Sequence, residues 1–175
     1  MKKGKKLLIN TILILIILLF AFYFGGYYLS KEQCIMESLR GLYAKETEII
    51  MELKRGNRSR VLVADTDNKT HSIIGVKKMG LLYHVDNTHS GMPIKEENVI
   101  DIVSAYGEEI GTVIFVYRND KSVAKVEVEF DSGDVVTMDD WKKDYVGCLE
   151  KENVFSNGVY RAYNASSELI GELEW

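Results

Sequence analysis

The stretch KKGKKLLINTILILIILLFAFYFGGYYL, residues 2–29, decides how the rest of the chain is placed. Four lysines precede an apolar run over residues 7–24, which is interrupted only by Asn10 and Thr11. As a helix, residues 7–29 would be about 34 Å long, enough to cross a hydrocarbon core of about 30 Å. The sequence therefore predicts a transmembrane helix over residues 7–29.

The composition favours a retained signal anchor over a cleaved signal peptide. Signal peptides have an apolar core of about 7 to 15 residues and are cut after small residues. Here the core is longer, and the residues three positions before cuts at Gly25 or Gly26 are the bulky Tyr23 and Phe24. We therefore expect residues 7–29 to remain in the mature protein and to contact the lipid bilayer.

The lysines predict the orientation of the anchor. Residues 1–6 contain four lysines, whereas the window after the anchor contains only Lys31 and Arg40. Because basic residues stay on the cytoplasmic side, residues 1–6 form a cytoplasmic stub and residues 31–175 lie outside the cytoplasm. The expected location is thus the cell membrane, in a single-pass arrangement.

Charge and cysteine content exclude some classes of partner and fold. Beyond the stub, 18 basic residues stand against 26 acidic ones, and residues 107–175 contain 7 against 15. An acidic domain argues against nucleic acid, which needs clustered lysine and arginine. Two cysteines, Cys34 and Cys148, are too few for a disulfide framework, and we expect them to be unpaired.

Residues 31–56 have helical spacing. Apolar side chains recur at intervals of three and four, and Gly56 suits a helix end. We therefore expect an amphipathic helix over residues 31–56 that continues from the anchor. Its apolar face is expected to pack on the protein's own β domain; the alternative is a homodimer formed through the 31–54 helix.

After Gly56 the pattern alternates, which predicts a mostly antiparallel β domain over residues 57–175, built from hairpins. The fold class is thus α+β and β-rich. An alternative division splits this domain into two halves, residues 57–106 and 107–175. Residues 93–106 suit a helix that starts at Pro93 and stops at Gly107, but the β-branched side chains of residues 99–106 favour a strand there. The expected strands are residues 60–65, 71–78, 81–85, 99–106, 110–117, 123–130, 135–138, 145–149, 158–163 and 169–174.

A hairpin formed by residues 110–130, IGTVIFVYRNDKSVAKVEVEF, is the clearest sheet element. Together with DSGD at residues 131–134 and GVYRAYNASSELIGE at residues 158–172, it resembles a pattern in uncharacterised membrane-anchored, extracytoplasmic β-domain proteins of low-GC Gram-positive bacteria. The resemblance implies a bacterial cell-surface setting and a β-rich fold. It brings no catalytic residues.

Few residues suggest a site. The candidate metal ligands are His71, His84, Asp86 and His89, although scattered histidines on a β domain are usually solvated. Residues 86–98 form the longest expected loop, and its residues His89, Met92, Glu96 and Glu97 are the candidates for partner binding. A mobile connection is the alternative interpretation of this loop.

The basic residues Lys54, Arg55, Arg58 and Arg60 have two interpretations. They could contact anionic polymers or lipid head groups, but a helix terminus followed by a solvated strand entry is the favoured one. No motif for nucleophilic catalysis or cofactor binding is present in the sequence.

The expected function is therefore a non-enzymatic role at the cell surface, in which the module binds or modulates an unidentified protein or envelope partner. A pilin-like assembly subunit is one alternative, because pilins have an apolar N-terminal helix that runs into an α/β head. An envelope enzyme is the other, and a polar pocket with converging acid and base groups would support it.

Overall fold

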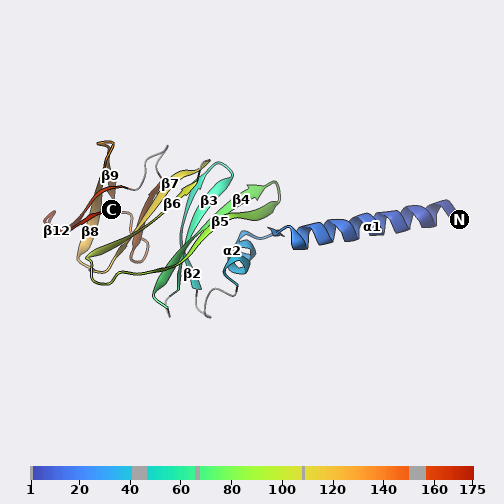
Figure 1. Ribbon diagram of the computed structural model, residues 1–175, viewed down its shortest axis with the longest axis horizontal. Helices are drawn as coiled ribbons and strands as arrows, with labels where there is room; N and C mark the ends of the chain where they lie inside the picture. The colour runs from blue at the N-terminus through green and yellow to red at the C-terminus, as the bar shows by residue number, and fades with distance from the viewer. Residues whose placement is uncertain (1, 41–46, 66–67, 108, 150–156) are drawn as a thin grey trace.

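The computed structural model describes residues 2–40, 47–65, 68–107, 109–149 and 157–175, and it consists of a long helix attached to a layered β domain (Figure 1). Helix α1 (Lys2–Phe24) extends away from the rest of the protein. Its segment Gly4–Phe24 is long and apolar enough to cross a membrane, and none of that segment is buried by the protein. The expected N-terminal apolar helix is thus present.

The helix ends earlier in the chain than the expected residue 29, and it does not continue into the next element. It ends at Phe24, and Gly26 follows with φ +67°, a left-handed conformation that glycine adopts readily. Strand β1 (Tyr27–Tyr28) then pairs with a strand of the β domain, Tyr27 opposite His84 and Tyr28 opposite Tyr83. Helix α1 is therefore connected to the β domain through a short paired strand rather than through one continuous helix.

The expectation of a helix over residues 31–56 is wrong in its second half. Helix α2 (Lys31–Leu39) begins after Ser30, whose side chain accepts a hydrogen bond from the Gln33 N–H. Thr47–Arg55 is instead strand β2, and residues 41–46 lie outside the described residues. The apolar spacing was ambiguous, and the choice is decided by tertiary pairing, because β2 pairs along its length with the next strand.

The continuous 31–54 helix required for a dimer face is consequently not formed. The apolar residues of α2 that are buried, Cys34, Ile35 and Leu39, pack on the protein's own sheet against Val61, Val63, Ile74 and Val76. Cys34 and Cys148 are not joined by a disulfide, and they lie in different parts of the domain. Burial raises the pKa of the Cys34 thiol to about 11.

The described residues of the β domain form three antiparallel sheets. The five-stranded sheet has the order β1-β5-β4-β3-β2, the three-stranded sheet β10-β7-β6, and the four-stranded sheet β12-β11-β8-β9. The remaining strand bounds are β3 (Arg58–Asp65), β4 (Thr70–Met79), β5 (Leu82–Pro93), β6 (Ile100–Gly107), β7 (Gly111–Arg118), β8 (Val123–Phe130), β9 (Val135–Met138), β10 (Tyr145–Leu149), β11 (Gly158–Asn164) and β12 (Leu169–Glu174). The expected β-rich fold of antiparallel strands is confirmed.

The sheets stack as layers, with the three-stranded sheet in the middle (Figure 1). One apolar cluster, which includes Leu62, Ile73 and Phe115, lies between the five-stranded and three-stranded sheets. A second cluster, which includes Ile114, Val128 and Tyr160, lies between the three-stranded and four-stranded sheets. Helix α2 covers the outer face of the five-stranded sheet, so the domain has four layers.

Strands β7 and β8 form as expected, but they do not pair with each other. Strand β7 pairs with β6 and β10, whereas β8 pairs with β11 and β9. Every residue of β7 from Gly111 to Val116 is buried, which is typical of a strand covered on both faces. In strand β8 buried residues alternate with more exposed ones, as expected for a strand in an outer layer. The turn between β7 and β8 connects two different layers.

Two further expectations concern residues 86–106. Residues 99–106 do form a strand, β6 (Ile100–Gly107). The long irregular loop over residues 86–98 is wrong in its first half, because β5 continues to Pro93 and pairs with β4. Since β1 pairs only with residues 83 and 84, the rest of β5 is a sheet edge, and polar side chains are normal there. The β domain also begins earlier than residue 57, because β1, α2 and β2 are part of its layers.

Candidate functional site

The four residues considered for a metal site do not converge. Within the described ranges, no group of three or more histidine, cysteine, aspartate or glutamate side chains could hold a metal ion. His71 is buried between the sheets, with its ring 6.5 Å from that of Tyr145. The Nδ1 atom of His84 lies 3.1 Å from the carbonyl oxygen of Gly26, and His89 is exposed on the edge of β5.

The residues considered for a partner-binding loop are also dispersed. His89 and Met92 are on β5, and Met92 packs against the cluster between the first two sheets. Glu96 follows β5 and forms an ion pair with Lys69 at 2.6 Å, with both side chains exposed. Glu97 lies in the same connection to β6. They remain candidates for surface contacts.

Asp86, the fourth metal candidate, is the centre of an ion-pair cluster. The register of β5 on β4 shifts between Gly75 and Val76, and Asp86 is the extra residue of this bulge. Bulges of this kind redirect a side chain. The Asp86 carboxylate accepts from Arg58 at 2.5 Å and from Arg60 at 2.8 Å, and Arg58 also donates to Glu109 at 2.5 Å.

Arg60 is unusual because its side chain is almost completely buried, at 2% exposure. Space for the guanidinium comes from two glycines, Gly75 on β4 and Gly107 at the end of β6, where an added Cβ atom would overlap it. Arg60 was expected at a solvated strand entry. The sequence signal for its burial is Gly75, which interrupts the apolar run of Ile74 and Val76 in β4, since glycines inside strands often mark a close approach.

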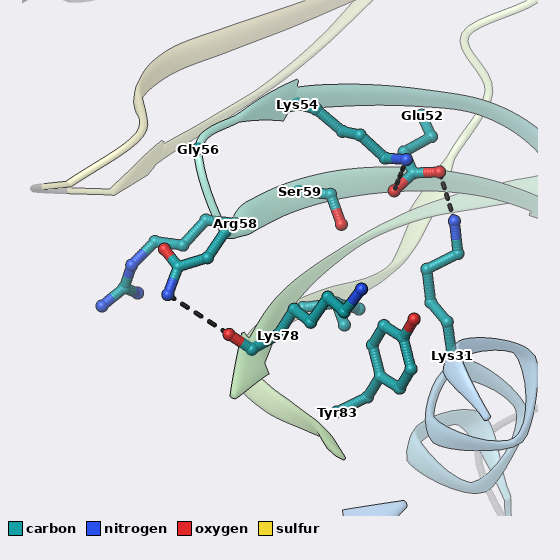
Figure 2. Close-up of a pocket in the computed structure, with 10 residues that line it drawn as sticks. Lys31, Glu52, Lys54, Gly56, Arg58, Ser59, Lys78 and Tyr83 are labelled. Carbon is teal, nitrogen blue, oxygen red and sulfur yellow. Dashed lines mark hydrogen bonds and ion pairs between the residues drawn. The ribbon is translucent and has the colours of Figure 1, made fainter. Parts of the chain in front are cut away.

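A basic pocket lies beside α2 on the outer face of the five-stranded sheet (Figure 2). Its volume is about 260 Å³. The wall is formed by the start of α2, the turn that joins β2 to β3, and the turn-proximal ends of β4 and β5. Its charged and polar side chains are Lys31, Glu52, Lys54, Asn57, Arg58, Ser59, Lys78 and Tyr83.

The single carboxylate of the pocket, Glu52, is held in its ionised form. It forms an ion pair with Lys31, and Lys54 Nζ lies 3.6 Å from its Oε1. Burial would raise the pKa of Glu52, but hydrogen bonds from Lys31 and Ser59 and the charges of the two lysines bring this pKa below its ordinary value. Glu52 therefore orders the lysines rather than serving as an acid.

Lys78 adds a third ammonium group from the opposite wall. Its Nζ lies over the ring of Tyr83, 5.9 Å from the centroid, and Figure 2 shows it pointing into the pocket. The backbone around it is fixed, because the Lys78 N–H donates to the Asn57 carbonyl at 2.7 Å and the Asn57 side chain donates to the Lys78 carbonyl at 3.2 Å. The pocket lining thus contains three lysines and one carboxylate.

This arrangement can bind an anion. Arg58 is already paired with Asp86 and Glu109, so the excess positive charge in the pocket comes from the lysines. Lysine ammonium groups are mobile donors that bind phosphate and carboxylate as point charges. Lys54 and Arg58 belong to the basic cluster expected from the sequence. Lys31 and Lys78 do not, since only strand register and the position of α2 bring these distant residues to the pocket.

No protein family model, no curated protein and no solved structure matches this chain.

Proposed function

We propose that this chain is a single-pass membrane protein whose β-rich domain lies outside the cytoplasm and binds an anionic group of an envelope partner in the basic pocket, in a binding rather than a catalytic role. The observation that carries the proposal is the pocket itself, whose lining contains three lysines, Lys31, Lys54 and Lys78, and one carboxylate, Glu52, which pairs with Lys31 and Lys54. Lysine excess in a concave site is suited to phosphate or carboxylate groups.

The attachment of the domain supports a role close to the membrane. Only Gly25 and Gly26 separate α1 from β1, and β1 is paired with β5. The pocket residue Lys31 is the first residue of α2, seven positions after the end of α1. Any ligand in the pocket is therefore held within a short distance of the end of the anchor.

The two alternatives receive less support. A pilin-like subunit needs an apolar helix that runs into the head, and α1 instead ends at Phe24 before β1. An enzyme would need a converging acid and base. The pocket offers one carboxylate, Glu52, and the lysines around it lower its pKa.

Calorimetric titration of the full chain in zwitterionic detergent tests the pocket, with inorganic phosphate as the probe. We expect Lys54→Gln combined with Lys78→Gln to weaken phosphate binding at least about tenfold, because charge-assisted hydrogen bonds are lost. Lys142→Gln is the matched control, since Lys142 is exposed and lies outside the pocket lining.

The unmodified chain, and the Lys142→Gln variant with it, should retain binding. Phosphate binding that is unaffected by the two pocket substitutions, or absent from the unmodified chain, would contradict the proposal.

A further inference from the structure

The turn between β4 and β5 exposes apolar side chains that the fold does not use. Leu81 is 84% exposed and Met79 is 45% exposed, on either side of Gly80. Gly80 has φ +64°, which gives a tight turn and leaves both side chains at its tip. An exposed leucine at a hairpin tip contributes nothing to the core. Its side chain therefore contacts either water or a surface outside the domain.

This tip lies beside the outer end of the anchor. Tyr83, which follows the tip, pairs with Tyr28 of β1. Leu82 lines the same surface hollow as Leu19 and Phe22 of α1 and Leu29 after β1. In Figure 1 the β4–β5 hairpin extends from the β domain toward the side on which α1 leaves it. The apolar tip and the apolar anchor therefore form one continuous surface.

The neighbouring exposed side chains suit a membrane interface. Tyr23 and Phe24 at the end of α1 are 84% and 75% exposed, and Leu29 is 78% exposed. Aromatic rings of this kind sit at the level of lipid head groups, and apolar side chains near a bilayer surface gain from entering it. If α1 spans the bilayer, its outer end and the adjacent tip face the same leaflet.

The charge beside the tip matches that position. Lys78 precedes Met79 and points into the basic pocket, which also contains Lys31 and Lys54. Lysine near a membrane surface is attracted to anionic lipid and can extend to the phosphate level. The apolar tip and the cationic pocket are thus at the same end of the five-stranded sheet. The tip would match the boundary of the acyl chains, and the pocket would match the level of the lipid head groups.

We propose that the hairpin tip, residues 79–82, is a second membrane contact that enters the lipid interface and places the basic pocket at the level of the phosphates of anionic lipids, which are its ligand. This inference rests on the proposed function and specifies the source of the anion. The domain is then held against the leaflet at two points, the anchor and the hairpin.

Tryptophan quenching tests the contact in the full chain, reconstituted in phosphatidylcholine vesicles with bromine on the upper part of the acyl chains. The emission of Trp141 and Trp175 is subtracted by using the unmodified chain. We expect the added emission of Leu81→Trp to be strongly quenched. Leu169→Trp is the matched control, because Leu169 is also exposed, at 52%, but lies on β12 in the most distant layer. Its emission should be unchanged.

Equal emission of Leu81→Trp with brominated and ordinary lipid would overturn the hairpin contact. Shielding of this tryptophan from a water-soluble quencher in zwitterionic detergent, without quenching by brominated lipid, would also overturn it and would indicate a protein partner.

A second arm measures the lipid in the pocket. Mass spectrometry of the full chain, extracted from vesicles of phosphatidylcholine and phosphatidylglycerol, should show retained phosphatidylglycerol that is lost in the Lys54→Gln, Lys78→Gln variant and kept in Lys142→Gln. If the pocket binds inorganic phosphate but retains no phosphatidylglycerol, this inference fails and the proposed function stands. If it binds neither, both fail.

Discussion

Arg60 shows how a single residue connects two layers of the domain. Its guanidinium lies between Gly75 and Gly107 and pairs with Asp86 at the β5 bulge. A buried charge needs its partner, because removing one member of such a pair leaves the other desolvated and uncompensated. The neighbouring Arg58 shares Asp86 and lines the basic pocket, so the cluster also fixes one wall of that pocket.

Replacing Arg60 should therefore destabilise the domain. For Arg60→Ala we expect a loss of about 3 kcal/mol in the free energy of unfolding, at the low end for a broken buried pair because Arg58 still neutralises Asp86. Urea unfolding of the full chain in detergent, followed by circular dichroism, measures it. Arg161→Ala is the control, since Arg161 pairs with Glu129 and Glu172 on the surface and should change stability much less. Equal losses would contradict the role of burial.

His71 predicts a dependence of stability on pH. Burial lowers the pKa of His71, and the nearby Asp101 only partly opposes this. The unfolded state therefore binds a proton more readily than the folded state. The stabilisation is complete above the ordinary histidine pKa of about 6.5 and is lost as pH falls below it.

The measurement is urea unfolding at about pH 7.5 and pH 5, on either side of that ordinary pKa. The loss at the lower pH should be smaller in His71→Gln than in the unmodified chain. His89→Gln, at an exposed position on β5, should behave like the unmodified chain. The prediction fails if His71→Gln retains the full dependence.

At the scale of elements, helix α2 is a cover for the five-stranded sheet. Ile35 is completely buried, whereas Met36, the next residue, is 44% exposed. We expect Ile35→Ala to lower stability by about 2 to 5 kcal/mol, as other buried aliphatic truncations do. Met36→Ala on the same helix should have a small effect. The same urea unfolding measures both, and similar losses would show that α2 does not pack as described.

Element type was predictable wherever one sequence pattern dominated. The alternation in β8 and the glycine-containing turn after it gave β8 and β9, and the pattern of residues 158–174 gave β11 and β12. The helix predicted for residues 47–55 was wrong because isoleucine and leucine at helical spacing also fit a strand. Pairing with β3 decides between the two structures. Pairing partners were less predictable, since the continuous apolar run in β7 marks a strand buried on both faces without saying which strands flank it.

The candidate site was even less accessible from sequence. Lys54 and Arg58 are close in the chain, but Lys31 and Lys78 reach the pocket only through the placement of α2 and the register of β4 on β3. The three histidines were selected by residue type alone, and sheet geometry separates them. Residue type suggests chemistry, but only register brings side chains together.

At the scale of the whole molecule, the proposed orientation predicts a protease pattern. Protease added to intact protoplasts should digest the β domain and leave a fragment that contains residues 1–24, because in the proposed orientation the N-terminus with its four lysines is cytoplasmic. Detection of tags at each end of the chain measures this. A cytoplasmic protein serves as the control for lysis, and a β domain that stays intact in unlysed protoplasts would overturn the orientation.

The layer order also has a consequence for the way the protein is made. The strands of the five-stranded sheet come from one continuous part of the chain, β1 to β5, whereas the middle sheet that covers its inner face comes from residues 100–149. Because chains are synthesised from the N-terminus, the first sheet can form before its cover exists. Leu62 and Ile73 would then face water until β6, β7 and β10 are added. The nascent sheet would then expose an apolar face. If α1 is already inserted in the membrane, as proposed, it would hold this intermediate at the surface and away from other copies with which it could aggregate.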